Sequence, residues 1–275
     1  MTLGITALVL FAALLHALWN ALVKGASDRV VMLGLIALGH VVPGVVLVLI
    51  SPGVAGQAWP YIVASTVIHW GYYVFLNLSY RFADLSLAYP IARGAAPVLV
   101  ALGAMLWAGE YLPPLAWLGI LTISAGIMVL ALRRASEKRA LGAALATSVF
   151  IAAYSVVDGI GIRLSGSPVS YIGWLFTAEA FTAAFIFASR ARVLVTLPGR
   201  TLWIGFWGGV LSGLAYALVL HAKLVTPIGI VSALRETSVI FAALIGVVFM
   251  GEGPAGRRVL AAGIVAAGIV LLAAS

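Results

Sequence analysis

Cysteine is absent from this chain of 275 residues, which excludes a disulfide framework, Cys-ligated zinc and iron–sulfur clusters. Charged residues are also scarce, at 9% of the sequence against about 25% in ordinary soluble proteins. Hydrophobic residues make up 64%, and the mean hydropathy is +1.17. So few polar side chains cannot cover a globule of this size in water. We therefore expect an all-α integral membrane protein whose apolar surface faces lipid.

The long apolar runs predict ten transmembrane helices. A span with a short loop needs roughly 25 to 30 residues, so the chain has room for about ten spans and for no separate soluble domain. Charged residues and Gly/Pro-rich breaks separate the apolar runs, which we place at 3–23, 30–50, 58–80, 86–107, 114–132, 140–162, 169–189, 201–222, 227–249 and 257–274.

The basic residues are distributed unevenly among the loops. A net charge of +8 would favour a nucleic-acid partner in a soluble protein, but in a membrane protein it indicates cytoplasmic loops and contact with anionic lipid, and we expect no nucleic-acid partner. Even-numbered loops hold only Arg163 and Lys223. Because basic loops stay in the cytoplasm, we predict that the odd-numbered loops are cytoplasmic and that both termini lie outside. The odd-numbered loops hold twelve basic residues: Lys24, Arg29, Arg81, Arg133, Arg134, Lys138, Arg139, Arg190, Arg192, Arg200, Arg257 and Arg258.

The two halves of the sequence resemble one another. Residues 81–132 align without gaps onto 223–274, with eleven identities in 52 positions. The pairs include Arg93 with Arg235 and the Gly-Glu at 109–110 with that at 251–252. Five helices in each half would place the second half in the opposite orientation. We therefore predict two inverted repeats, residues 1–135 and 136–275, around a central cavity that opens alternately to either side.

Several stretches carry a resemblance to a known family. LLHALWNALVK at 14–24, AYPIARGAAPVL at 88–99, AAYSVVDGIGIR at 152–163, ALRETSVIFAALIG at 233–246 and the two Gly-Glu pairs resemble the drug/metabolite transporter superfamily, in its EamA-like ten-helix branch. The chain looks most similar to bacterial exporters of amino acids, including aromatic ones. The resemblance implies a basket of ten helices in the bacterial inner membrane, a small-molecule substrate, and a central cavity lined mainly by the first, third, fourth, sixth, eighth and ninth helices. We expect a monomer or a weak homodimer.

Polar and aromatic side chains at membrane depth are candidates for the substrate cavity, since such groups are costly in lipid. In the first helix these are His16, Trp19 and Asn20, which either form a hydrogen-bonding wall or join helices. The third helix has a stripe at four-residue spacing, His69, Tyr73 and Asn77, which suits an amphipathic ligand such as an aromatic amino acid.

The fourth and ninth predicted spans each carry an arginine. Arg93 follows Tyr89 and Pro90 and precedes Pro97, and we expect the two prolines to open the helix and free carbonyl groups toward the cavity. Arg93 or its repeat counterpart Arg235 could hold a substrate carboxylate with two parallel hydrogen bonds. The alternatives for Arg93 are that it caps the freed carbonyl groups or pairs with an acid in another helix, and for both arginines we favour packing and gating roles over direct binding. Glu236, next to Arg235, is also a candidate site residue.

Asp158, one turn after Tyr154 in the sixth helix, is the candidate proton-coupling acid. A carboxyl group that is desolvated can alternate between a proton and a substrate amine. The alternative is a static ion pair with an arginine. For Glu179 we expect a structural hydrogen bond, and for Glu110 and Glu252 a role in loops or helix caps. With four scattered histidines and no HExxH spacing, we expect no metal site.

These features favour a secondary carrier that is not an enzyme and needs no cofactor. No GxxxxGK[ST] motif is present for ATP, and no GxSxG, GxSG or GxGD motif for an intramembrane hydrolase. We expect export of amino acids or related small amphipathic metabolites by alternating access, driven by a proton gradient or by the substrate gradient. The alternatives are a multidrug or other metabolite carrier of the same fold, an intramembrane enzyme, and a channel or scaffold.

Overall fold

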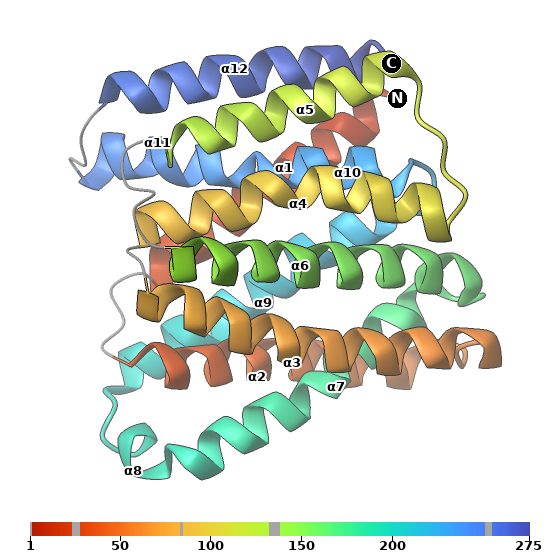
Figure 1. The fold of residues 1–275 in the computed structure, drawn as a ribbon. Coiled ribbons are helices and arrows are strands. Elements are labelled where there is room, and N and C mark those ends of the chain that lie inside the picture. The colour runs from red at the N-terminus through yellow and green to blue at the C-terminus, as the bar shows by residue number, and fades with distance from the viewer. Residues whose placement is uncertain (1, 24–27, 83–84, 132–137, 251–254) are drawn as a thin grey trace.

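The computed structural model describes residues 2–23, 28–82, 85–131, 138–250 and 255–275, and within these residues the chain is all-helical (Figure 1). Eight helices of this part of the chain are long and apolar enough to cross a membrane. The helices are α1 (Leu3–Val23), α2 (Arg29–Ile50), η1 (Gly56–Ala58), α3 (Trp59–Phe82), α4 (Leu85–Trp107), α5 (Pro114–Val129), α6 (Lys138–Leu164), α7 (Pro168–Ser189), α8 (Ala191–Leu194), α9 (Gly199–Ala222), α10 (Ile228–Glu236), α11 (Ser238–Met250) and α12 (Ala255–Ala273).

A helix lies over each of the ten apolar runs, and the all-α membrane class is confirmed. The helices over two of these runs, α3 and α5, are not among the eight that are long and apolar enough to cross a membrane. The helix α5 is apolar but has only 16 residues. The helix α3 carries the polar and aromatic stripe, which makes it less apolar. The number of spans therefore remains a prediction, while the helical character of every run is established.

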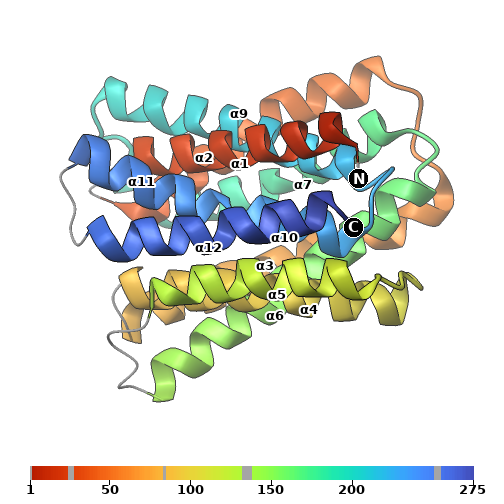
Figure 2. The ribbon, with the colours of Figure 1, turned by 90° about the horizontal axis from the view of Figure 1, so that it is seen from above.

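The helices pack as a bundle that contains both parallel and antiparallel pairs, with α5 and α12 along one edge and α7 along the other (Figures 1 and 2). Two pairs join segments far apart in the sequence, since α2 packs on α7 and α5 packs on α12. The helix α6 packs on α3 and α4, and α1 packs on α9, α10 and α11. Both termini lie at the same end of the bundle (Figure 1).

Glycines permit the closest approach between helices, at the crossing of α2 and α9. A Cβ on Gly209 would lie 2.3 Å from the carbonyl oxygen of Ile36, and a Cβ on Gly39 would lie 2.3 Å from that of Phe206. Side chains larger than hydrogen cannot fit there, so the backbones of α2 and α9 touch. Small residues of this kind are a common means of tight helix packing in membranes.

The ninth predicted span is broken at Thr237, which separates α10 from α11. The amide of Thr237 donates to the carbonyl of Leu234, three residues back, and its hydroxyl donates to the same oxygen at 2.6 Å. This tight turn holds Arg235, Glu236 and Ser238 at the break. The backbone at Thr237 keeps right-handed helical dihedral angles, with φ −59° and ψ −15°, so α10 and α11 together form one span, Ile228–Val248, which is one of the eight apolar helices.

The expectation that Pro90 and Pro97 open the fourth helix is wrong, because α4 is continuous from Leu85 to Trp107. The carbonyl of Ala92, between the two prolines, accepts a hydrogen bond of 2.9 Å from the Ser148 hydroxyl of α6. The neighbouring helix thus supplies a donor in this stretch of α4.

Candidate functional site

A cavity of about 790 Å³ lies inside the bundle, which is the size of a typical small-molecule site. Its wall includes residues of α1, α2, α3, α4, α6, α7, α9, α10, α11 and α12. The contributions of α2, α7 and α12 were not expected. None of the lining residues belongs to the connections 51–58, 108–113, 164–167 or 223–227 at the end that holds the termini. The cavity therefore extends toward the opposite end, where it reaches Arg257 and Arg258 of α12.

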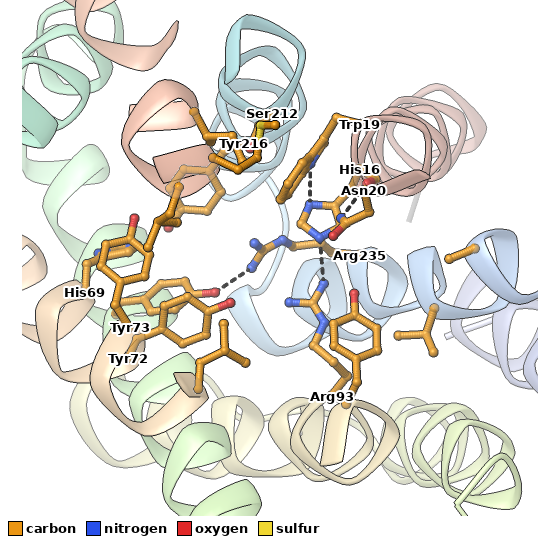
Figure 3. Close-up of a pocket in the computed structure, with 18 of the residues that line it drawn as sticks. His16, Trp19, Asn20, His69, Tyr72, Tyr73, Arg93, Ser212, Tyr216 and Arg235 are labelled. Carbon is orange, nitrogen blue, oxygen red and sulfur yellow. Dashed lines mark hydrogen bonds between the residues drawn. The ribbon is translucent and has the colours of Figure 1, made fainter. Parts of the chain in front are cut away.

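The α1 part of the wall is formed by His16, Trp19 and Asn20, as the sequence predicts (Figure 3). The indole N–H of Trp19 lies 3.4 Å from His16 Nδ1, and a guanidinium nitrogen of Arg93 lies 3.3 Å from His16 Nε2. A neutral imidazole has one acceptor nitrogen, so only one of these two contacts is a hydrogen bond at a time. The amide of Asn20 donates to the His16 carbonyl at 2.7 Å, which fixes its side chain along α1.

The α3 part of the wall is aromatic. The His69 ring stacks on Tyr154 of α6 with ring centroids 4.2 Å apart. The Tyr73 hydroxyl donates to Glu179 Oε1 at 3.0 Å. Asn77, the third member of the predicted stripe, is exposed and does not line the cavity. Leu76, at the same level of α3, does line the cavity, so Asn77 lies on the outward side of the helix. Over eight residues a stripe at four-residue spacing turns by about 80° around an α-helix.

Arg93 is held in place by contacts with several surrounding side chains. Its Nε lies 2.5 Å from Glu236 Oε2, and the side chains are 3% and 2% exposed. A second nitrogen donates to the Ser238 hydroxyl at 3.3 Å, and the Tyr89 ring lies 5.6 Å from the guanidinium carbon. Tyr89 and Arg93 line the cavity, whereas Glu236 lies behind them. The open alternative of an ion pair between Arg93 and an acid of another helix is the arrangement present.

Arg235 has a different environment, although it is the repeat counterpart of Arg93. Its guanidinium points into the cavity and donates one hydrogen bond, from Nη1 to the Tyr154 hydroxyl at 3.2 Å (Figure 3). It also lies over the faces of Tyr216 and Tyr154, 5.1 Å and 5.9 Å from the ring centroids, where a cation is attracted electrostatically.

Asp158 is fully buried and does not line the cavity. Its carboxylate accepts hydrogen bonds from the hydroxyls of Tyr171, at 3.1 Å, and of Tyr216. No arginine of the described residues lies within ion-pair distance of it. Because the Tyr216 ring is part of the cavity wall, Asp158 is connected to the cavity through one phenol.

The lining residues that were not predicted as site residues include His40, Tyr72, Glu179 and Tyr216. The expected structural bond of Glu179 is the one with Tyr73. Its other oxygen, Oε2, and His40 Nε2 are buried without a hydrogen-bond partner in the described part of the chain. His40 and Glu179 could have been found from the sequence, because ionisable groups are rare in apolar spans. Tyr216 follows no motif. Among the described residues, no group of three His, Asp or Glu side chains could hold a metal ion.

An ionic cluster lies at the end of the bundle that holds the termini, where no connection contributes to the cavity wall. Glu110 and Arg163 form an ion pair of 2.6 Å, with side chains 11% and 30% exposed. Arg163 also donates to the carbonyls of Lys223, at 2.7 Å, and Thr226, at 3.1 Å. Glu110 accepts a hydrogen bond of 2.7 Å from the amide of Ile228, so it caps α10. These contacts join the α4–α5 connection, the end of α6, and the α9–α10 connection.

The Gly-Glu pair at 109–110 forms the turn that brings Glu110 into this cluster. Gly109 has φ +65, a left-handed conformation that glycine adopts without strain. The turn lets the Glu110 amide donate to the carbonyl of Ala104. It also places the Glu110 carboxylate beside Arg163 of α6 and the first amide of α10. The counterparts Gly251 and Glu252 lie outside the described residues, as do Lys24, Arg133 and Arg134.

No family model and no curated protein matches the chain. A solved crystal structure described only as that of a protein is similar, with a TM-score of 0.75 and 20% sequence identity. The alignment covers 98% of this chain and 96% of that chain. At this identity the similarity shows a shared fold across nearly the whole chain.

Proposed function

We propose that this protein is a secondary carrier that exports amino acids, with aromatic ones as the leading candidates, or related small amphipathic metabolites across a bacterial inner membrane by alternating access. The observation that carries the proposal is the difference between the two ends of the cavity. One end reaches the lining residues Arg257 and Arg258, while the other is sealed by the ion pair of Glu110 and Arg163. A cavity accessible from one side at a time is what a carrier requires.

The helix contacts support an inverted repeat. If α1, α2, α3, α4 and α5 correspond to α6, α7, α9, α10–α11 and α12, the most extensive helix contacts have counterparts under exchange. The packing of α3 on α6 corresponds to that of α9 on α1, and the packing of α4 on α6 to that of α10 and α11 on α1. The pairs α2–α7 and α5–α12 map onto themselves. This is the pattern of two halves related by a two-fold axis.

The distribution of charge supports an orientation. The described basic residues outside the helix interiors gather at the end opposite the termini, with Arg163 and Lys223 at the terminal end. By the positive-inside rule the basic end faces the cytoplasm. The arrangement described here is then the inward-facing one, ready to take up a solute from the cytoplasm.

The chemistry of the wall supports a flat, amphipathic solute. The side chains of Trp19, His69, Tyr72, Tyr73 and Tyr216 offer ring faces together with N–H and O–H groups. Such walls bind ligands through both apolar contact and directed hydrogen bonds. In ten-helix carriers of the EamA-like branch, which this chain resembles, small metabolites are the expected cargo.

Counterflow in proteoliposomes tests the proposal. Vesicles loaded with an unlabelled amino acid and diluted into a trace of the same labelled compound should accumulate label transiently, and empty vesicles should not. Tryptophan, phenylalanine and tyrosine are the first compounds to use, followed by the remaining amino acids. If no compound on the inside accelerates uptake, the carrier proposal fails.

A further inference from the structure

The charges around the cavity do not balance. Arg93, Arg235 and Glu236 lie together at the break between α10 and α11, which gives two guanidinium groups and one carboxylate. Glu236 pairs with Arg93 at 2.5 Å, and both are almost fully buried. This pairing leaves the charge of Arg235 without a carboxylate partner among the described residues.

The other acids near the cavity are engaged elsewhere. Glu179 holds the Tyr73 hydroxyl, and Asp158 lies behind the wall with the hydroxyls of Tyr171 and Tyr216. Neither lies within ion-pair distance of Arg235 in the described structure. A buried guanidinium with no counter-ion is unfavourable at membrane depth, so an anion that enters the cavity gains more there than in water.

The hydrogen bonds of Arg235 leave donors free for such an anion. A guanidinium has five N–H donors, and Arg235 uses one of them on the Tyr154 hydroxyl. The rings of Tyr154 and Tyr216 hold the group in place by their faces, without neutralising it. The residue as a whole is 8% exposed, and it lines the cavity. The side chain is thus fixed in place, and its remaining donors are available to an occupant of the cavity.

We propose that Arg235 binds the carboxylate of the transported solute, and that the solute is a small carboxylate with a flat apolar portion. The inference rests on the proposed function and gives its substrate class. With the carboxylate on Arg235, the apolar portion lies against the adjoining wall of His69, Tyr72 and Tyr73, which reaches Arg235 through Tyr154. Organic cations are excluded by repulsion from the same charge.

Arg93 has a different role in this proposal. Its contacts with His16, Ser238 and Glu236 join α1, α4 and the break between α10 and α11. It is a positioning residue whose charge is already neutralised. The two arginines occupy matching positions of the sequence repeat, yet only one of them is available to a ligand.

Binding to the purified protein in detergent tests the proposal independently of transport. The probes are L-tryptophan and indole-3-propionate, which carry a carboxylate, and tryptophan methyl ester and tryptamine, which do not. The same comparison is made with phenylalanine, tyrosine, leucine and their methyl esters. We expect every compound that binds the unmodified protein to carry a carboxylate. If an ester or amine binds as tightly as its acid, or if none of the acids binds, the proposal is overturned.

Three variants locate the site. Arg235→Gln should weaken carboxylate binding roughly tenfold to hundredfold, because charge-assisted hydrogen bonds are lost. Arg235→Lys should bind with intermediate affinity, since it keeps the charge without the planar pair of donors. Arg200→Gln removes one exposed positive charge far from the cavity wall and should bind as the unmodified protein does. Unchanged affinity in a folded Arg235→Gln variant overturns the proposal.

The binding result and the counterflow result can fail separately. If carboxylates bind through Arg235 but no counterflow occurs, the site stands and the carrier proposal fails. If counterflow occurs with esters and amines as well as acids, the carrier proposal stands and the role of Arg235 fails.

Discussion

The two ends of the bundle are built from different interactions. At the end that holds the termini, Glu110 and Arg163 draw three separate connections together through an ion pair and three hydrogen bonds to the backbone. At the opposite end the cavity reaches Arg257 and Arg258, and its wall includes aromatic rings and the guanidinium of Arg235. In the proposed transport cycle, the contacts of Glu110 and Arg163 at the end that holds the termini, which we call the closed end, break and re-form together when access changes.

The largest effect is expected from reversing a charge at the closed end. Arg163→Glu places a second carboxylate against Glu110 and removes the donors to the carbonyls of Lys223 and Thr226. We expect a loss of about tenfold in the counterflow rate, since repulsion is added to the loss of a partly exposed pair. The double exchange, Glu110→Arg with Arg163→Glu, should recover part of the rate. If the double variant is no better than the single one, the pair does not close this end.

The second effect is on the pH dependence of transport and concerns Asp158, which lies between the cavity and the closed end. If Asp158 is the proton-coupling acid, Asp158→Asn leaves transport independent of pH across the neutral range, because an amide does not titrate. The measurement is the counterflow rate as a function of pH, with Glu179→Gln as a matched control for the other buried acid. An unchanged pH profile in Asp158→Asn would leave Asp158 with a structural role, as the acceptor for Tyr171 and Tyr216.

At the open end, we expect a smaller effect from removing single rings of the wall. His69→Ala and Tyr73→Ala should weaken binding of the best carboxylate severalfold with little loss of thermal stability, since one ring contact contributes roughly 0.5–1.5 kcal/mol. Trp203→Ala is the matched control, because the Trp203 side chain is 63% exposed on the bundle surface and lies outside the cavity wall. Wild-type affinity in both His69→Ala and Tyr73→Ala would mean that the α3 stripe contributes packing alone.

The smallest effect is on the pH dependence of thermal stability. It concerns Lys223, which lies beyond the end of α9 at the closed end. Burial lowers the pKa of Lys223 from 10.5 to about 7, with Asp158 opposing the shift and Arg235 and Arg163 adding to it. The folded protein then binds fewer protons than the unfolded chain between pH 7 and 10.5, so this lysine makes stability rise with pH in that window and level off below it.

Lys223→Met should remove that rise, seen as a flatter plot of melting temperature against pH, by a few degrees. The exposed Lys138 supplies the control variant, Lys138→Met, which should keep the slope of the unmodified protein. Equal slopes in all three proteins would contradict a depressed pKa for Lys223.

The sequence predicted the positions of the helices well and the depth of individual side chains poorly. Apolar runs mark helix ends directly, as the segment 3–23 and the helix Leu3–Val23 illustrate. A spacing of four residues gives the face of a helix and not the level along it. Asp158 shares a face with Tyr154 but lies one turn nearer the closed end, outside the cavity wall. Asn77 is at the level of the lining residue Leu76, but it is exposed on the other side of α3.

The turn at Thr237 and the ion pair of Arg93 with Glu236 were not predicted. The turn has a local signal, because the polar run Arg235-Glu236-Thr237-Ser238 is followed there by the apolar residues of α11. The pairing depends on a contact between α4 and α10 across the bundle, which periodicity within one helix cannot give. In contrast, the matching of Arg93 with Arg235 in the repeat directed attention to both arginines.

The central claim is that the cavity is reached from the basic end while the cluster of Glu110 and Arg163 is intact. Because the chain has no cysteine, one introduced thiol reports access without background. Ser212→Cys places it on the cavity wall, and a membrane-impermeant maleimide is applied to each face of sealed vesicles of known orientation. We predict fast labelling from the side of the basic loops and slow labelling from the side of the termini, with the latter raised severalfold by Glu110→Gln. Equal labelling from both sides, unaffected by Glu110→Gln, would contradict the account.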